Sequence, residues 1–451
     1  MSGVASGRNN HGPDPFRPDT ETTYVVRFLN PTSNKPLHLG HFRNATLGNA
    51  ISASLKYIGN CTFSHCFIED AGPHMAQAID GFLRRSSFDF ESPKSDRIVG
   101  NFYRTHSKVV KAKGEQKGVH GRCKWALDSP EKTRAWNLLK EMALSGQNHT
   151  LVRAGIAFNC IDYESAEDHY LAAFASLGLQ RNVFTQRNDG SLVYAHGDRD
   201  LVLIDGYGEC QENIRLLSFL YRIYDEWPER WVNVIVAGEE WKRSMDQFPE
   251  ILSRLGVHRS YDIYQPTYTG MVNINRKKMA SSVGNGILID TLMDRLIQAI
   301  PLLRIVLRSE GLISPDQVAS LVLRSFFLSV PRAQVVEFGA EDVLNEEANP
   351  GWRIAEMQAD LVRQKRIATG GDLWAKSLIE NALTSLSFER PMRELESLSS
   401  SYRGKDWDEQ SALSANALLD GMGLTPSSSR VSFPSQSLSE LIANYGTGVG
   451  R

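Results

Sequence analysis

The sequence predicts an α/β protein whose parallel sheet is interrupted by an insertion and followed by an all-α C-terminal domain. Three observations support this fold class. Near the start, a strand, a breaker-rich loop, a helix and a second strand follow one another, which is the order of a parallel unit. A continuous apolar run, Trp231 to Ala237, suits a strand that is buried on both faces. Beyond Asp290 almost every segment has helical spacing.

The first of these elements has the clearest boundaries. Tyr24 to Leu29 is a run of β-branched and aromatic residues, and a loop rich in Asn, Pro and Ser follows it. Small and apolar residues then recur at helical spacing from His41 until Gly59, and Cys61 to Ile68 has the composition of a second strand. This order predicts a ligand site at the carboxyl end of the first strand, where the helix directs its positive N-terminus.

The rest of the chain contains an insertion, further strands and then helices. Residues 80–150 are rich in Lys, Arg and Ser and predict the insertion, with a helix around Pro130 to Leu144. Strand patterns at Leu192–Tyr194 and Leu201–Leu203 indicate that the sheet resumes. Helices are predicted at Thr291–Ile305, Pro315–Val330, Trp352–Arg366 and Leu373–Leu383. We therefore expect a disordered leader (1–22), a parallel-sheet domain (23–290), a helical domain (291–426) and a flexible Ser/Gly-rich tail (427–451).

Composition excludes several classes of protein. The 451 residues have a formal net charge of −2, which argues against a surface devoted to nucleic acid. No run approaches the roughly 20 apolar residues of a membrane span, and the polar start lacks the order of a secretory signal. We therefore expect a cytoplasmic protein with no membrane partner, and a monomer. Five cysteines without CxxC pairs or zinc-type histidine spacing predict free thiols and no protein metal site.

Two short motifs point to chemistry. His38 and His41 stand three residues apart at a strand-to-helix junction, with Gly40 between them. A glycine lets a flat ligand approach the backbone, and imidazoles at a helix N-terminus can donate hydrogen bonds to phosphate. Far downstream, Arg276 to Asn285 (RKKMASSVGN) is a basic segment. Taken singly, the two histidines are as readily structural as functional, and the basic segment is typical of a solvated surface loop.

Together the two motifs resemble the HIGH and KMSKS signatures of class I aminoacyl-tRNA synthetases, and their surroundings are similar to arginyl-tRNA synthetases in particular. The resemblance runs in order from about Tyr24 to Arg366 and implies a Rossmann-like, HUP-type catalytic domain followed by a shortened anticodon-binding domain. Its segments are residues 34–43 (NKPLHLGHFR), 69–72 (EDAG), 155–165 (GIAFNCIDYES), 201–206 (LVLIDG) and 237–240 (AGEE).

The resemblance implies that ATP converts an amino acid to an aminoacyl-adenylate, with Mg²⁺ as the counter-ion of the polyphosphate. His38 and His41 would hold the phosphates, Gly40 would admit adenine, and Lys278 would neutralise pyrophosphate. The other residues that the motifs assign to ATP by position are Gly238, Glu239, Lys277, Met279, Ser281 and Ser282.

One cation is missing from the downstream signature. Ser281 stands where the signature has its second lysine. Many arginyl enzymes share this loss and carry a lysine just before the first motif, a place that Lys35 occupies here. The resemblance therefore implies that Lys35 is catalytic, although a solvated loop lysine is the alternative.

The amino-acid site departs from the family pattern. The resemblance assigns this site to Asn30, Thr32, Asp70, Glu209, Asn213 and Gln247. In the family a "TY-x-x-x-DIA" segment supplies an acid and a tyrosine to arginine, whereas here Asn213 falls at the acid and no tyrosine matches. An asparagine removes the charge that would pair with a guanidinium. Either Glu209, Glu212 or Glu240 supplies that charge, or the bound side chain is not arginine.

Two further departures concern tRNA. Only about 22 polar residues precede the first strand, where the family has a tRNA-gripping domain, and the helical domain is short.

Our leading hypothesis is a repurposed enzyme that activates arginine or a relative with ATP and transfers it to an amine or amino acid in (cyclo)dipeptide biosynthesis. The alternatives are a cyclodipeptide synthase that uses charged tRNA, a compact true arginyl-tRNA synthetase, and a non-catalytic tRNA-binding paralogue.

Overall fold

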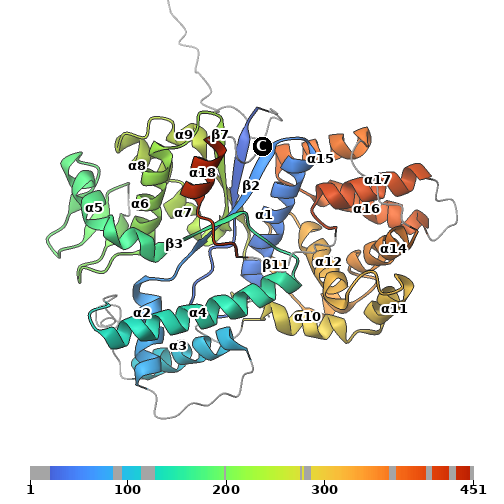
Figure 1. The fold of residues 1–451 in the computed structure, drawn as a ribbon, viewed down its shortest axis with the longest axis horizontal. Coiled ribbons are helices and arrows are strands. Elements are labelled where there is room, and N and C mark those ends of the chain that lie inside the picture. The colour runs from blue at the N-terminus through green and yellow to red at the C-terminus, as the bar shows by residue number, and fades with distance from the viewer. Residues whose placement is uncertain are drawn as a thin grey trace, which may run out of the picture.

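A five-stranded parallel sheet forms the centre of the molecule (Figure 1). The computed structural model describes residues 21–84, 94–112, 127–197, 200–274, 277–278, 286–364, 372–402, 409–425 and 433–446. The strand order is β3-β2-β1-β7-β8, and every neighbouring pair is parallel. The order reverses beside β1, and open parallel sheets bind ligands at such a switch point. The strands are β1 (Thr23–Arg27), β2 (Cys61–Ile68), β3 (Cys160–Tyr163), β7 (Trp231–Gly238) and β8 (Tyr264–Thr269).

The predicted strand–helix–strand unit at the start is confirmed. Helix α1 (Leu39–Tyr57) follows β1 and ends just before Gly59, whose φ of 101° suits glycine. Gly48 lies where α1 crosses β1, and a Cβ atom there would stand 2.2 Å from the ring of Phe28. This glycine therefore lets the helix pack closely against the strand.

Helices cover both faces of the sheet. Alternate residues of β1 face opposite sides, so that Val25 joins one hydrophobic core and Val26 the other. Figure 1 shows α1, α12, α14, α15, α16 and α17 on one side, with α5, α6, α8 and α18 on the other. Apart from α18 (Leu438–Gly446), the second group consists of η1 (Glu164–His169), α5 (Leu171–Gln180), α6 (Glu212–Asp225), η2 (Glu239–Trp241), α7 (Lys242–Met245), α8 (Phe248–Arg254) and α9 (Ser260–Ile263).

The segment predicted as an insertion, residues 80–150, and the residues that flank it form three helices with a small core of their own. They are α2 (Gly72–Leu83), α3 (Ser95–Ala112) and α4 (Pro130–Arg153), and α4 includes the helix predicted around Pro130. Ile79, Val99 and Leu139, one from each helix, belong to this separate core. The three helices lie beyond the carboxyl end of β2, at the bottom of the view in Figure 1.

The expectation that the main sheet resumes near residue 192 is wrong. Strands β4 (Thr185–Gln186), β5 (Leu192–Tyr194) and β6 (Leu201–Ile204) form a separate antiparallel sheet. A short connection joins antiparallel neighbours, whereas a strand that enters a parallel sheet needs a long crossover. The connection between β5 and β6 is too short for such a crossover.

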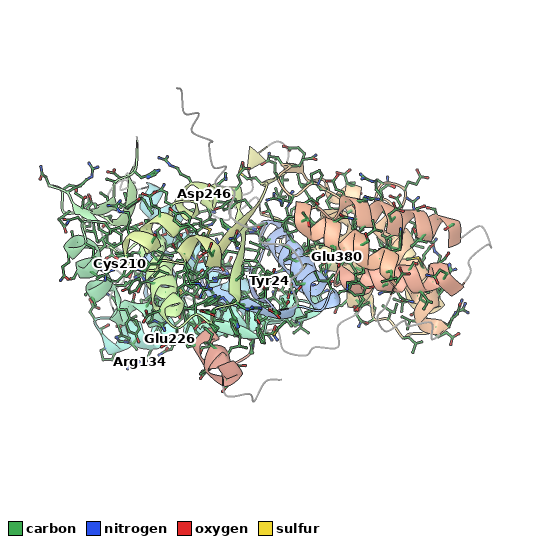
Figure 2. The ribbon with its side chains drawn as sticks, turned by 90° about the horizontal axis from the view of Figure 1, so that it is seen from above. Tyr24, Arg134, Cys210, Glu226, Asp246 and Glu380 are labelled. Carbon is green, nitrogen blue, oxygen red and sulfur yellow. The ribbon has the colours of Figure 1, made fainter. Side chains whose placement is uncertain are left out.

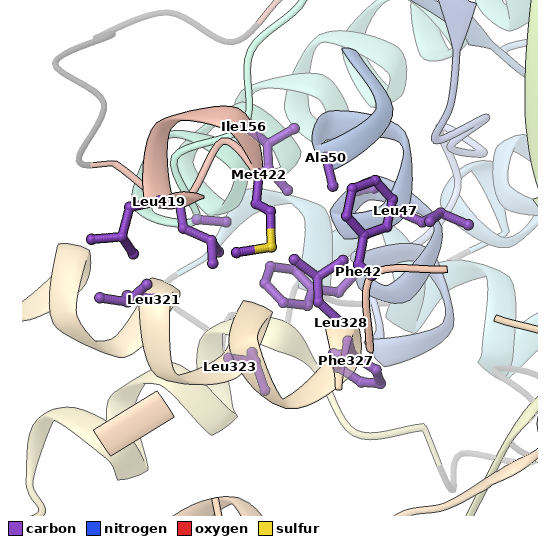
Figure 3. Close-up of a cluster of buried hydrophobic side chains, with 14 of the residues drawn as sticks. Phe42, Leu47, Ala50, Ile156, Leu321, Leu323, Phe327, Leu328, Leu419 and Met422 are labelled. Carbon is purple, nitrogen blue, oxygen red and sulfur yellow. The ribbon is translucent and has the colours of Figure 1, made fainter. Parts of the chain in front are cut away.

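The C-terminal helices share one core with α1, and Phe42, Leu47 and Ala50 of α1 meet Phe327 and Met422 there (Figure 3). Seen from above, Glu380 of α15 and Cys210 lie on opposite sides of Tyr24 (Figure 2). The helices are α10 (Ile289–Ile297), α11 (Ile300–Arg308), α12 (Pro315–Leu328), α13 (Ala340–Leu344), α14 (Gly351–Arg363), α15 (Leu373–Ser385), α16 (Glu389–Tyr402) and α17 (Glu409–Gly421). None of the helices in the described residues is long and apolar enough to cross a membrane.

Two details of the helical region differ from the prediction. The helix predicted over 291–305 is divided into α10 and α11, because Pro301 in the first turn of α11 favours a new helix start. The region is also not purely helical, since β11 (Val336–Glu337) pairs with β9 (Val272–Ile274), which in turn pairs with β10 (Lys277–Lys278). This third sheet joins the helical region to the end of the parallel-sheet region.

The expectation of a flexible tail over 427–451 is wrong for residues 433–446. Helix α18 (Leu438–Gly446) packs against the sheet, and Leu438 is fully buried. The backbone N–H of Leu438 donates to the carboxylate of Asp162 in β3 at 3.0 Å. An apolar contact and a partner for the helix N-terminus, both remote in sequence, therefore hold this segment in place.

Candidate active site

A polar cavity opens at the carboxyl ends of β1, β2, β7 and β8, beside the N-terminus of α1. Leu29 directs the chain into this cavity with a φ of 57°, a strained conformation for leucine. The polar side chains that line the cavity are Asn30, Thr32, Lys35, His38, His41, Asn44, Glu69, His74, Glu212, Glu240, Trp241 and Thr269. The site therefore lies where the sequence predicts a ligand, at the end of the first strand.

The two histidines are fixed by a reciprocal cap on α1. The backbone N–H of Gly40 donates to Nδ1 of His38, and the backbone N–H of His38 donates to Nδ1 of His41, both at 3.2 Å. The rings stack with centroids 3.8 Å apart. Since both Nδ1 atoms accept hydrogen bonds, a neutral ring carries its proton on Nε2. The cap therefore leaves two Nε2–H donors beside the cavity.

Burial keeps both imidazoles neutral. Burial, together with a smaller contribution from the nearby charge of Lys35, lowers the pKa of His38 to about 3. Burial likewise holds the pKa of His41 well below its ordinary value, with smaller contributions from His38 and Lys35. The pair can thus donate hydrogen bonds to a phosphate without a change of protonation.

Three carboxylates and one ammonium group share the other wall. Burial lowers the pKa of Lys35, while Glu69, Glu212 and Glu240 oppose that shift. Burial also raises the pKa of Glu69 well above its ordinary value, and repulsion from Glu212 adds to it, whereas Lys35 acts in the opposite direction. The pKa of Glu212 is raised by burial and lowered in part by Lys35 and Arg215. The acids outnumber the single cation among them, so this wall favours a positively charged ligand.

The structure brings several predicted residues together. Asn30, Thr32, Lys35 and Gly238 line the cavity together with Gly40 and the two histidines. The Asn30 Oδ1 and Thr32 Oγ1 atoms are buried without a hydrogen-bond partner among the described residues. Buried polar atoms ordinarily have partners, so these two are suited to contact a ligand.

The structure does not place Asp70 in the cavity. Its carboxylate accepts hydrogen bonds from the backbone N–H and the hydroxyl of Ser165, both at 2.8 Å, and from the ammonium of Lys140 at 3.2 Å. Asp70 is fully buried. It therefore joins β2 to the insertion and to the segment after β3, and the adjacent Glu69 faces the cavity instead.

Three other residues predicted for the amino acid also lie outside the cavity lining: Glu209, Asn213 and Gln247. Glu212, one of the acids proposed to replace the missing charge, does line it, because α6 begins at this residue. Helical geometry directs the next residue, Asn213, about 100° away from Glu212. Exposed Glu239, predicted for ATP, is likewise outside the lining, whereas its neighbour Glu240 is part of it.

The basic segment is described only in part. The backbones of Lys277 and Lys278 form β10, antiparallel to β9. Met279, Ser281 and Ser282 lie outside the described residues. The roles that the resemblance assigns to all five residues in ATP binding and catalysis remain predictions.

The sequence reasoning missed His74 and did not assign Glu69 to the site. Glu69 lies in the quoted segment EDAG at the end of β2, where strand-end position was an available signal. His74 lies in the first turn of α2, and no motif pointed to it. Only the packing of α2 beside the cavity reveals this residue.

Comparison with known proteins identifies the family. The model of the class I tRNA synthetase (R) catalytic domain matches residues 15–304, well over half of the chain. The chain belongs to this family. The predicted resemblance to class I synthetases of the arginyl type is thereby confirmed.

Individual relatives agree with the family assignment. The arginine--tRNA ligase of Treponema denticola is 28% identical over 366 residues, which cover 77% of this chain and 61% of that protein. The arginine--tRNA ligase of Bacteroides thetaiotaomicron is 24% identical, over 74% of this chain and 61% of its own length. The chain thus spans less than two thirds of the length of these curated relatives.

Solved structures confirm the class I synthetase fold. Arginyl-tRNA synthetase from Plasmodium falciparum superposes with a TM-score of 0.63 at 15% identity, covering 92% of this chain and 77% of that chain. The Thermus thermophilus enzyme gives a TM-score of 0.61 at 15% identity, covering 91% of this chain and 83% of its own. The predicted fold class is therefore correct.

Proposed function

We propose that this protein uses ATP to activate arginine or a related cationic amino acid as its aminoacyl-adenylate, and then transfers the acyl group to an amine. The observation that carries the proposal is one cavity with two different walls. Neutral histidines at the N-terminus of α1 form one wall, and Glu69, Glu212 and Glu240 surround Lys35 on the other. The first wall suits phosphates, and the second suits a cationic side chain.

The residues of the phosphate wall would stabilise charge that grows during adenylation. The amino-acid carboxylate attacks the α-phosphorus of ATP and pyrophosphate leaves, so charge develops on phosphate oxygens. His38 and His41 would donate Nε2–H bonds to these oxygens, and the N-terminus of α1 adds its positive dipole. Mg²⁺ would enter with the polyphosphate and reduce its charge.

The residues of the acidic wall would select the amino acid. Glu69 and Glu212 repel one another, and a guanidinium between them would relieve that repulsion with charge-assisted hydrogen bonds. Asn30 and Thr32 offer neutral polar atoms for the α-amino or carboxylate group. Glu212 would thus replace the acid that the sequence lacks at Asn213.

The acceptor is the part of the proposal that goes furthest beyond the family. We propose an amine, such as the α-amino group of a second amino acid, which would give a dipeptide or cyclodipeptide. Charged tRNA as the acyl donor is a variant of this proposal. A second candidate is arginyl-tRNA formation itself, which the names of the relatives favour. A monomeric state and a cytoplasmic location remain predictions.

Pyrophosphate exchange with a panel of amino acids, with and without tRNA, tests the proposal. We expect exchange with arginine or a close analogue, and we expect His41→Ala to slow it by roughly 100- to 1,000-fold, the usual cost of one oxyanion donor. His258→Ala, which alters an exposed histidine outside the cavity lining, is the control. Exchange that requires tRNA would favour the ligase candidate. Absence of exchange under every condition would exclude adenylation.

A further inference from the structure

His74 is held at the cavity between an acid and a phenol. It lies in the first turn of α2, with 45% of its side chain exposed. Its Nε2 atom is 3.6 Å from the Oε1 atom of Glu212, and its Nδ1 atom is 3.4 Å from the hydroxyl of Tyr103 on α3. The Nδ1 atom is thus within hydrogen-bonding distance of Tyr103, whereas the contact between Nε2 and Glu212 is an electrostatic one, and the ring is open to the cavity.

Neighbouring groups restrict the position of His74. The side-chain amide of Asn34 donates to the backbone carbonyl of His74 at 3.3 Å. The ring of Tyr103 meets the imidazole edge to face, with centroids 6.0 Å apart. α2, α3 and the loop before α1 thus hold the imidazole beside the acidic wall. A histidine held by a carboxylate and open to the site is the arrangement of a general base.

We propose that His74 is the general base that deprotonates the acceptor amine during acyl transfer, with Glu212 stabilising the resulting imidazolium. The amine nitrogen attacks the acyl carbonyl carbon and a C–N bond forms. The C–O bond to AMP then breaks, and AMP leaves with the electron pair. The acceptor ammonium first loses one proton to His74, which releases it to solvent before attack, and the nitrogen loses its second proton to His74 after the C–N bond has formed. Tyr103 is a positioning residue that acts through His74.

The chemistry of the acceptor is what requires such a base. An amino acid at neutral pH carries its α-amino group as an ammonium ion, which has no lone pair for attack. The carboxylates of the acidic wall attract that ion, and His74 stands among them to accept its proton. With aminoacyl-tRNA as the donor, the second of the two protons would pass through His74 to the ribose oxygen that leaves.

This inference rests on the proposed function, and the test separates the two. The full chain is supplied with ATP and arginine, and the acyl group is captured either by hydroxylamine or by an amino-acid amide. Hydroxylamine is unprotonated at neutral pH and needs no base, so hydroxamate reports activation alone. The amide product reports activation followed by base-assisted transfer. The measurement is repeated with arginyl-tRNA as the donor.

We expect His74→Gln to lower the ratio of the amide rate to the hydroxamate rate by about 100-fold or more. We expect added imidazole to restore part of the amide rate in His74→Ala. We expect Tyr103→Phe to lower the same ratio by a smaller factor, and His258→Gln to leave it unchanged. Rescue by imidazole is a result that a merely structural role would not produce.

Three outcomes would overturn the inference. Equal loss of both rates in His74→Gln, without imidazole rescue in His74→Ala, would make His74 a binding or structural residue. Hydroxamate without amide from the wild-type chain, with either donor, would show that amines are not its acceptors. Absence of hydroxamate and of exchange would exclude the activation step itself.

Discussion

Glu69 and Glu212 come from different elements, and each is harder to ionise because it is largely shielded from solvent and lies near the other. Glu69 directly follows β2 and Glu212 begins α6, and both pKa values are raised chiefly by burial. Lys35 offsets part of this cost. A cationic ligand would offset more of this cost. The site should therefore bind a cation more tightly than a neutral ligand of the same shape.

Replacement of one acid tests that selectivity. We expect Glu212→Gln to weaken arginine binding by roughly 10- to 100-fold, since a hydrogen bond to a charged group contributes about 1.5–3 kcal/mol. The preference for arginine over citrulline, its neutral analogue, should shrink as well. Binding is measured as the KM for each amino acid in pyrophosphate exchange. Glu226→Gln, at the exposed far end of the same helix, is the matched control. An unchanged preference would show that Glu212 does not contact the side chain.

The raised pKa values also predict the pH dependence of binding. In the free protein Glu69 retains its proton to a higher pH than an ordinary glutamate. A bound cation favours the ionised form, so binding releases protons and strengthens as pH rises toward the free-state pKa, above which it levels off. The affinity for arginine, measured from acid to mildly basic pH, should therefore increase with pH and then become constant. Glu69→Gln should flatten the profile, and an identical profile in that variant would contradict the assignment.

At the scale of elements, α18 shows how a segment with little local signal becomes ordered. The backbone N–H of Ile161 in β3 donates to the carbonyl of Gln436 at 2.8 Å. Asp162 accepts from His65 of β2 at 2.9 Å as well as from the backbone of Leu438 at 3.0 Å. The segment therefore covers the β3 edge of the parallel sheet, which is otherwise open to pairing with another chain.

Removal of the apolar contact of α18 tests its contribution. We expect Leu438→Ala to lower the free energy of unfolding by roughly 2–5 kcal/mol, because the leucine is fully buried against the core that covers this face of the sheet. Denaturant unfolding measures the change, with Ala443→Ser on the exposed side of the same helix as the control. A loss below about 0.5 kcal/mol, typical of surface positions, would mean that α18 does not stabilise the fold.

At the scale of the whole molecule, Arg43 joins the helical region to the cavity. This side chain of α1 is 3% exposed, and its guanidinium donates to five backbone carbonyls at 2.7–3.2 Å. Burial lowers its pKa to about 10, so it stays charged at neutral pH. The acceptors are Gly270, Met271, Pro331, Arg332 and Gln334, and the first two line the cavity.

Arg43→Lys tests this connection. An ammonium group has three donors and cannot reach five carbonyls arranged around a planar fork. We expect a loss of roughly 2–4 kcal/mol in unfolding free energy, because buried acceptors are left without partners. We also expect a higher KM for arginine, since the loop at Gly270 and Met271 would shift. Arg363→Lys, on the exposed side of α14, is the control in both assays. Unchanged values of both quantities would contradict the role of Arg43.

The sequence alone determined the β1–α1–β2 unit and the two histidines, because each depends on neighbours within one short segment, and it determined the family through the order of short motifs along the chain. The strand pattern, the breaker loop, the helix N-terminus and Gly40 all lie within residues 23–68. Only the tertiary structure decided which acids face the cavity, since β2 and α6 supply them from positions far apart in the chain. The same holds for His74, for Arg43 and for α18, whose partners are remote in sequence. Local patterns specify backbone geometry, whereas the packing of distant elements decides where a side chain is buried, which charge it meets and what it can bind.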